Sequence, residues 1–296
     1  MELLPTEILF GIVKYLDNWD VKQLSLSSRR VRDVCLPTLF RKLSIEFSNE
    51  GFDLLESILE SNLHRYIVSF EYVAPMLLKP EIRNYEFFKT QILSPQAYVE
   101  TCESYDDVNS EDWDEMEYLS GDLPSYTRVY KTLRRTCAEE QEIIETGRGL
   151  TLMSLAFNLL SNLKELILVF RQRRDDEDWE TDYQQVYDMT QQRSYEHHIK
   201  LVLAALKGCS ITLKAIEITC LDPPDDSPSG SWDSLTIPLT ELVGHAPGLR
   251  LVESALPLAL LCRISLNRAS YNVTLSPCDL SVFIMSKSVT REGLPL

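Results

Sequence analysis

The chain has 296 residues, 44% of them hydrophobic and 25% charged, which is typical of a globular protein and excludes a disordered or collagen-like chain. It carries 45 acidic and 29 basic side chains, and the resulting net charge of −16 repels a phosphate backbone and argues against nucleic-acid binding. The longest apolar run, residues 255–262, is far shorter than the ~20 residues that span a bilayer. We therefore expect about two structural units in an intracellular protein, cytoplasmic or nuclear, that binds no membrane.

Three short helices are predicted in the first 45 residues, which also differ from the rest of the chain in charge. Seven basic and five acidic side chains give this segment a net charge of +2, and the remaining residues carry −18. Asp20 and Ser28 are suitable N-caps for the second and third helices, and the third is expected to end before Pro37. So small a unit cannot bury all of its apolar surface, and part of it remains for a partner.

Residues 3 to about 42 resemble an F-box. The resemblance rests on the order and spacing of Leu4-Pro5-Thr6-Glu7-Ile8-Leu9, Ile12, Tyr15-Leu16, Asp20, Leu24-Ser25-Leu26, Ser28-Arg29-Arg30, Arg32 and Leu39-Phe40. Phe40 stands where many F-boxes carry tryptophan, so an aromatic side chain is kept there. The resemblance implies docking on a Skp-family adaptor and, through it, on a cullin. The positions that match the family's contact motif are Leu4, Pro5, Ile8, Leu9, Ile12, Leu16 and Leu24.

Residues 46–296 alternate between short strands and helices. The strands are predicted at 40–45, 65–70, 163–168, 213–218 and 261–266, and the helices at 51–62, 126–145, 149–161, 194–207 and 238–245. This alternation resembles the degenerate leucine-rich-repeat-like region of F-box proteins abundant in filamentous fungi. We therefore expect an α+β or α/β chain, with an N-terminal three-helix F-box (1–45) followed by an irregular leucine-rich-repeat-like solenoid. A compact α/β domain would give a similar periodicity.

Three segments, at 97–122, 171–188 and 222–233, are predicted to be loops or insertions. Acidic residues concentrate in all three, the third within a wider acidic stretch at 215–249. If the insertions emerge on one face, their charge would speed encounter with a protein substrate that has a basic surface, and aromatic residues such as Trp113 could anchor it. The alternative interpretation is that these acids only keep a large apolar body in solution.

The sequence contains no evident catalytic or metal-binding constellation. The seven cysteines lack Cys-x-x-Cys spacing and are predicted to be free thiols. His197 and His198 are adjacent, so on a helix their rings would point about 100° apart and could not bind one ion together, and we expect them on a surface face. A glycine-rich phosphate loop and a Gly-x-Ser-x-Gly elbow are also missing. We therefore expect no catalytic residue, metal or cofactor.

The function implied by the resemblance is that of a substrate-recognition subunit of an SCF-type cullin-RING ubiquitin ligase. Such a chain is not an enzyme, and it contributes by bringing a target protein close to the conjugating enzyme. One alternative is an F-box scaffold that acts outside the ligase. Another is a cysteine hydrolase with a helical cap, which would need a thiol, a histidine and an acid brought together by the fold.

Overall fold

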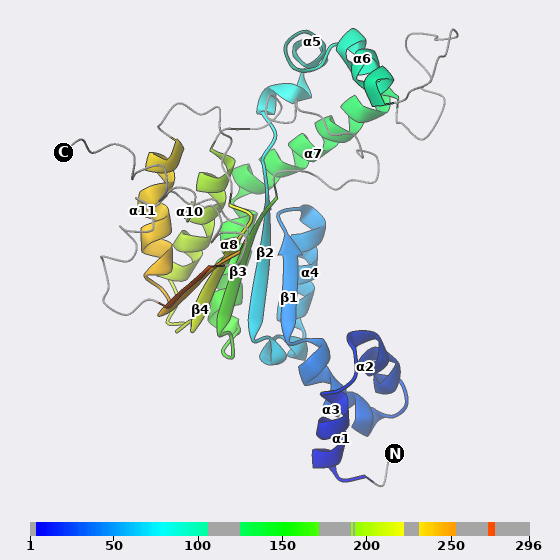
Figure 1. Ribbon diagram of the computed structural model, residues 1–296, viewed down its shortest axis with the longest axis vertical. Helices are drawn as coiled ribbons and strands as arrows, with labels where there is room; N and C mark the ends of the chain where they lie inside the picture. The colour runs from blue at the N-terminus through cyan, green and yellow to red at the C-terminus, as the bar shows by residue number, and fades with distance from the viewer. Residues whose placement is uncertain are drawn as a thin grey trace, which may run out of the picture.

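The computed structural model describes residues 4–105, 125–171, 191, 193–221, 231–252 and 272–275. Figure 1 shows three parts: a small helical head at the N-terminus, a central sheet with helices packed against it, and a group of helices beyond the far end of the sheet. Within the described ranges, none of the helices combines the length and the apolar character that crossing a membrane requires.

The head is a bundle of three helices, as the sequence predicts. Its helices are α1 (Thr6–Val13), α2 (Asn18–Ser25) and α3 (Arg29–Leu39). Both α1 and α2 pack on α3, and together they bury a small core of their own. This head core consists of Leu9, Val13, Val21, Val31, Val34 and Cys35. Because it contains few side chains, much of the head's apolar surface stays at the periphery.

The ends of the head helices agree only in part with the sequence prediction. Ser28 caps α3 as expected, and its hydroxyl accepts a hydrogen bond from the Val31 N–H at 3.3 Å. The cap of α2 is Asp17 and not Asp20, because the extended backbone lies at Asp17, whose carboxylate accepts the Asp20 N–H at 2.8 Å. Helix α3 also continues through Pro37, which in the last turn removes only one backbone hydrogen bond.

Six parallel strands form one sheet in the described part of the chain, and their order in the sheet is their order in the sequence. The first, third and fourth lie where strands are predicted, whereas the strand predicted at 65–70 overlaps the second only at residues 69–70. The segment 261–266 lies outside the described residues, and the sequence did not predict the last two strands. The strands are β1 (Lys42–Glu46), β2 (Ser69–Pro75), β3 (Glu165–Arg171), β4 (Ala215–Thr219), β5 (Gly248–Val252) and β6 (Asn272–Leu275).

Helices cover one face of this sheet (Figure 1), and they are α4 (Asn49–Glu60), α8 (Arg148–Leu159), α10 (Ser194–Lys207) and α11 (Ser231–Val243). Alternate strand residues point into the core between sheet and helices, among them Leu43, Tyr72, Leu168, Ile218 and Leu251. The predicted helices 51–62, 149–161 and 194–207 are confirmed. The one predicted at 238–245 begins earlier, at Ser231, and includes Pro238.

The mixed helix and strand class with a helical N-terminal unit is therefore confirmed. The leucine-rich-repeat arrangement stays a prediction, because the connections between successive strands are very unequal. Between β1 and β2 the chain forms α4 and the short helix η1 (Asn62–Tyr66), whereas a much longer segment with several helices connects β2 to β3. A regular repeat would place similar units between all strands.

The long β2–β3 connection builds a second small core beyond the carboxyl ends of the strands. Its elements are η2 (Pro80–Arg83), α5 (Tyr85–Phe87), η3 (Phe88–Ile92), α6 (Pro95–Tyr105) and α7 (Tyr126–Thr146). The Tyr126 hydroxyl donates to the Leu93 carbonyl at 2.7 Å and fixes α7 on the preceding segment. The insertion predicted at 97–122 begins inside α6, and its residues 106–122 lie outside the described ranges, as do 172–188 and 222–230.

Candidate functional site

Large apolar side chains are concentrated on the surface of the head. Of the eleven exposed large hydrophobic side chains in the described residues, five belong to α1, α2 or the residues that flank them: Ile8, Phe10, Tyr15, Trp19 and Leu26. Tyr15 is 92% exposed and Trp19 67%, although tryptophan is usually largely buried and tyrosine partly so. A concentration of this kind marks the outer surface of α1 and α2 as a candidate interaction surface.

The residues predicted to contact an adaptor differ in where the fold places them. Pro5 and Ile8 are exposed, and Ile12 is half-buried one helical turn after Ile8. Leu9 is fully buried in the head core. The other three are half-buried and pack against that core: Leu4, Leu16 and Leu24. Ile8 and Ile12 therefore form an accessible stripe on α1, whereas Leu9 contributes to holding the head together.

Exposed apolar residues that had no predicted role adjoin this stripe in the sequence. Tyr15 follows α1 three residues after Ile12, Trp19 lies in the first turn of α2, and Leu26 is the C-cap of α2. Tyr15 and Leu26 are part of the motif on which the resemblance rests. Phe10 and Trp19 had no periodicity signal, because they lie outside the buried stripe of their helices. For Trp19, a large apolar side chain between Asn18 and Asp20 is the signal that could have found it, whereas Phe10 lies among apolar residues and has no such signal.

Two arginines of α3 fix how α1 and α2 are held. Arg30 donates to the carbonyl oxygen of Leu4 at 2.8 Å and to the Thr6 hydroxyl at 3.5 Å, so the start of α1 is attached to α3. Arg32 donates to the carbonyl of Ser25 at 3.4 Å, at the end of α2. These bonds connect helix ends whose backbone groups have no partner within their own helix. The exposed apolar side chains of α1 and α2 are thereby presented on a defined scaffold.

Residues 1–46 match the model of the F-box-like family, which covers all three head helices and β1. The head is an F-box-like domain. No curated protein matches the chain. The expected F-box at the N-terminus is thus confirmed.

The F-box-like domain is joined to a body whose sheet has a second accessible surface. The side chains that face away from the helices are exposed or half-buried on β1, β3, β4 and β5. The parallel register aligns them in rows across the sheet, and the middle row contains Ser44, Glu71, Ile167, Glu217 and Arg250. The next row toward the carboxyl ends begins with the exposed Glu46 of β1 and the buried Val73, and continues with the half-buried Val169, Thr219 and Val252. We call these two rows the open sheet face.

Polar groups on the open sheet face are largely paired with one another. Glu71 accepts a hydrogen bond from the Ser44 hydroxyl at 2.7 Å and forms an ion pair with Lys42 at 2.5 Å. Partial burial pushes the pKa of Glu71 upward, but the hydrogen bonds from Lys42 and Ser44 outweigh it, and the pKa lies below its usual value. Arg250 and Glu217 form a looser ion pair at 3.6 Å. The face thus has neutralised charges beside a central apolar strip.

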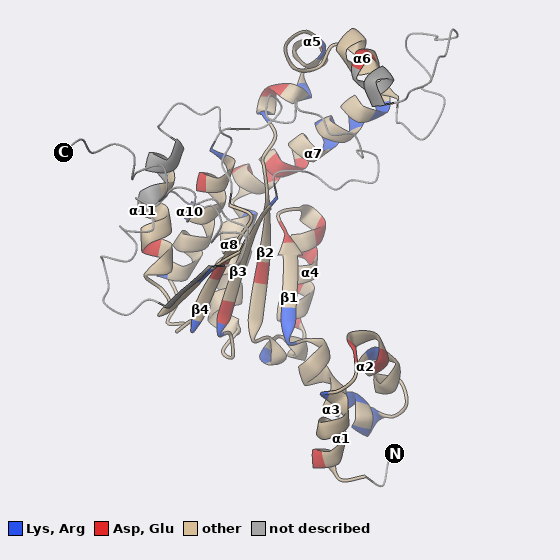
Figure 2. Cartoon of the chain, viewed as in Figure 1, with Lys and Arg blue, Asp and Glu red and all other residues tan. Residues whose placement is uncertain are grey.

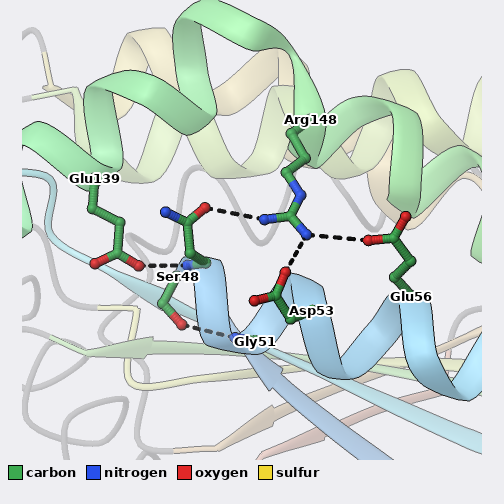
Figure 3. A network of polar contacts seen from close by, with 7 residues as sticks. Ser48, Gly51, Asp53, Glu56, Glu139 and Arg148 are labelled. Carbon is green, nitrogen blue, oxygen red and sulfur yellow. Dashed lines mark hydrogen bonds and ion pairs between the residues drawn. The ribbon is translucent and has the colours of Figure 1, made fainter.

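A polar network fixes the helix layer behind the sheet (Figure 3). Arg148, the first residue of α8, donates to Asp53 at 2.5 Å, to Glu56 at 3.3 Å and to Asn49 at 3.1 Å, all three on α4. Glu139 of α7 accepts the backbone N–H of Asn49 at 2.5 Å. The network connects α4 with the junction of α7 and α8. Because α7 belongs to the second small core, these contacts also help to hold that core in place relative to the sheet.

The sequence predicts that the two adjacent histidines lie on a surface face, but His198 is buried in the core and His197 is half-buried. His198 is 1% exposed, and its ring lies between the Tyr72 hydroxyl at 2.8 Å and the Pro75 carbonyl at 2.9 Å. The Phe47 ring packs edge-on against it. The prediction was wrong for His198 because both nitrogens of its ring have partners on the strand β2, so its burial leaves neither of them unpaired.

Two of the described cysteines, Cys35 and Cys209, lie in surroundings that disfavour a thiolate. Burial raises the pKa of the Cys35 and Cys209 thiols, which opposes the thiolate that attacks a substrate. The thiol of Cys209 donates to the Ala205 carbonyl at 3.1 Å, and that of Cys137 to the Lys79 carbonyl at 3.4 Å. Over the same ranges, no group of three or more histidine, cysteine, aspartate or glutamate side chains is arranged to hold a metal ion.

Proposed function

We propose that the chain is the substrate-recognition subunit of an SCF-type cullin-RING ubiquitin ligase. The observation that carries this proposal is the exposed apolar surface of α1 and α2 within a segment that matches the F-box-like family. Ile8, Ile12, Tyr15 and Trp19 would be covered by a Skp-family adaptor, and the adaptor would connect the chain to the cullin. Leu9 would support this surface from beneath, since it holds α1 against α3.

The body would hold the target protein, for which the open sheet face is the candidate surface. Its central apolar strip, with Ile167 and Val169, could supply the desolvated contacts that dominate the affinity of an interface. The paired charges around this strip would orient the target protein more than they would add to its affinity. The parallel strands in chain order, with helices on one face, support the related proposal that the body is a degenerate leucine-rich-repeat region of the kind found in fungal F-box proteins.

The proposed contribution to ubiquitylation is proximity, without chemistry by this chain. A target held on the body would be presented to the conjugating enzyme that the ligase carries, and the effective concentration of its lysines there would rise. The raised pKa values of Cys35 and Cys209 support this view over the alternative of a cysteine hydrolase.

Affinity capture of the tagged full chain from its own cells tests the proposal. We expect the adaptor and the cullin to be recovered together, and both to be lost from a Trp19→Ser variant whose circular dichroism is unchanged. Leu54→Ser is the matched control, because Leu54 is an exposed apolar residue on α4, away from the head. Recovery of the adaptor without any cullin would instead favour a scaffold outside the ligase, and recovery of neither would contradict the adaptor role.

A further inference from the structure

The first three turns of α7 carry a cluster of basic side chains in a protein whose net charge is −16. Arg128, Lys131, Arg134 and Arg135 are all exposed. Figure 2 shows them as blue segments on the half of α7 that lies farthest from the sheet. We call these four residues the α7 basic cluster.

Like charges spaced three and four residues apart on a helix repel one another, and the pairs 128/131, 131/134 and 131/135 have this spacing. Elsewhere in the body, basic residues such as Arg148, Lys207 and Arg250 form ion pairs. Lys131, Arg134 and Arg135 form no ion pair with any residue that the structure describes. The cluster therefore leaves several positive charges without a neutralising group on the described surface.

A hollow of about 350 Å³ lies over this cluster, lined by Ser125, Thr127, Arg128, Lys131, Thr132 and Arg135. The lining consists of cations and hydroxyl groups, all of which can donate to anionic oxygens. The opposite side of α7 is fixed in the second small core through Tyr126, Val129 and Leu133. The donors are thus mounted on a rigid helix, so binding an anionic ligand there would require little ordering of the backbone.

We propose that the α7 basic cluster binds an Asp/Glu-rich segment of a partner protein. From Arg128 to Arg135 the helix advances about 10 Å, which matches roughly three residues of an extended peptide and suits a row of carboxylates better than one compact anion. Residues 46–296 carry a net charge of −18, which repels such a segment elsewhere on the body and leaves this face as its docking place there. The cluster lies at the opposite end of the molecule from the F-box-like domain (Figure 1), so the inference does not depend on the adaptor role proposed above.

The test is the binding of a fluorescent 12-residue peptide of Asp and Glu to the full chain, followed by anisotropy over a range of salt concentrations. We expect binding that weakens steeply with salt, and a loss of roughly tenfold in affinity for the double variant Lys131→Gln/Arg135→Gln. The matched control is Lys164→Gln/Lys214→Gln, which removes the same charge from two exposed lysines at the amino ends of β3 and β4. The control should bind within about twofold of wild type.

Four results would overturn the proposal. The first is no binding by wild type. The second is an equal loss of affinity in both double variants, because the effect would then reflect net charge alone. The third is equal binding of an RNA oligonucleotide of the same length, which would indicate unspecific attraction of polyanions. The fourth is binding that appears only when Asp112, Asp114, Glu115 and Glu117 are replaced by their amides, because the cluster would then be occupied by the chain's own acidic segment.

Discussion

The burial of His197 makes the stability of the fold depend on pH. Burial disfavours the charged ring and lowers the pKa of His197, and its Nε2 atom has no hydrogen-bond partner among the residues that the structure describes. The unfolded chain binds this proton with an ordinary pKa of about 6.5. As the pH falls below that value the unfolded state is protonated first, so the free energy of unfolding decreases until the folded-state pKa is reached.

The variant His197→Gln should remove this part of the pH dependence. We expect the urea midpoint of wild type to fall more between pH 7.5 and pH 5.5 than that of the variant. Above pH 7 the midpoints of both proteins should depend on pH in the same way. Equal falls in both proteins would show that His197 is not kept neutral by the fold.

Gly51 occupies a position at which no side chain fits. It lies in the first turn of α4, and a Cβ atom there would be 2.1 Å from the carbonyl oxygen of Glu46 at the end of β1. We expect Gly51→Ala to lower the free energy of unfolding by about 3 kcal/mol, through displacement of α4 from the sheet. The control is Gly11→Ala in α1, where nothing lies within 4 Å of the added atom. The Gly11→Ala change should stabilise the head by about 0.5–1 kcal/mol. If a denaturant titration gave Gly51→Ala the same stability as wild type, this account of Gly51 would be contradicted.

At the scale of elements, Arg148 connects two helices that are about 90 residues apart in the sequence. Its guanidinium donates to three acceptors on α4, and the hydrogen bond to Asp53 raises the pKa of Arg148 above its ordinary value. Since its partners are largely exposed, we expect Arg148→Met to cost only about 1 kcal/mol, and less in 1 M salt. Lys207→Met, which breaks the single exposed pair with Glu241, should stay within about 0.5 kcal/mol of wild type. Equal effects of the two changes would show that the network adds nothing beyond an isolated ion pair.

The strands β1, β3 and β4 were predicted because a large apolar residue lies three positions before the first buried strand residue: Phe40, Leu163 and Leu213. In β5 this position holds the small Ala246, although Leu249 and Leu251 alternate as the buried residues of β4 do. The strand β6 is only four residues long, too short to establish a period. The helix predicted at 126–145 is confirmed as α7, the long helix of the second small core. The short helices α5 and η3 were missed, because they are single turns stabilised by contacts with α7 and not by their own pattern.

The candidate site was predicted as a region, but not residue by residue. The F-box resemblance names Ile8 and Leu9 together, and both are apolar. Only the packing of α1 on α3 decides that Leu9 enters the core and Ile8 stays accessible. The same limit applies to His198, whose burial depends on Tyr72 and Pro75, more than 120 residues away in the sequence. Contacts of this kind cannot be inferred from local spacing.

At the scale of the whole molecule, the head and the body have separate cores that meet between two adjacent residues. Leu39 packs against the head core and Phe40 against the core of the sheet. The F-box-like domain can therefore present its outer surface to a partner while the body keeps its own fold. The open sheet face and the α7 basic cluster both lie on the body, so they remain accessible when α1 and α2 are covered.

The most direct test is calorimetric titration of the purified full chain with a purified Skp-family adaptor. We expect binding by wild type, and at least about a tenfold loss of affinity for Ile8→Lys, because a charge would be buried in the centre of the interface. The matched control is Ile237→Lys on α11, an isoleucine of comparable exposure in the body, which should bind as wild type does. An Ile8→Lys variant that keeps its helical content and binds the adaptor with unchanged affinity would contradict the proposal that α1 forms the docking surface.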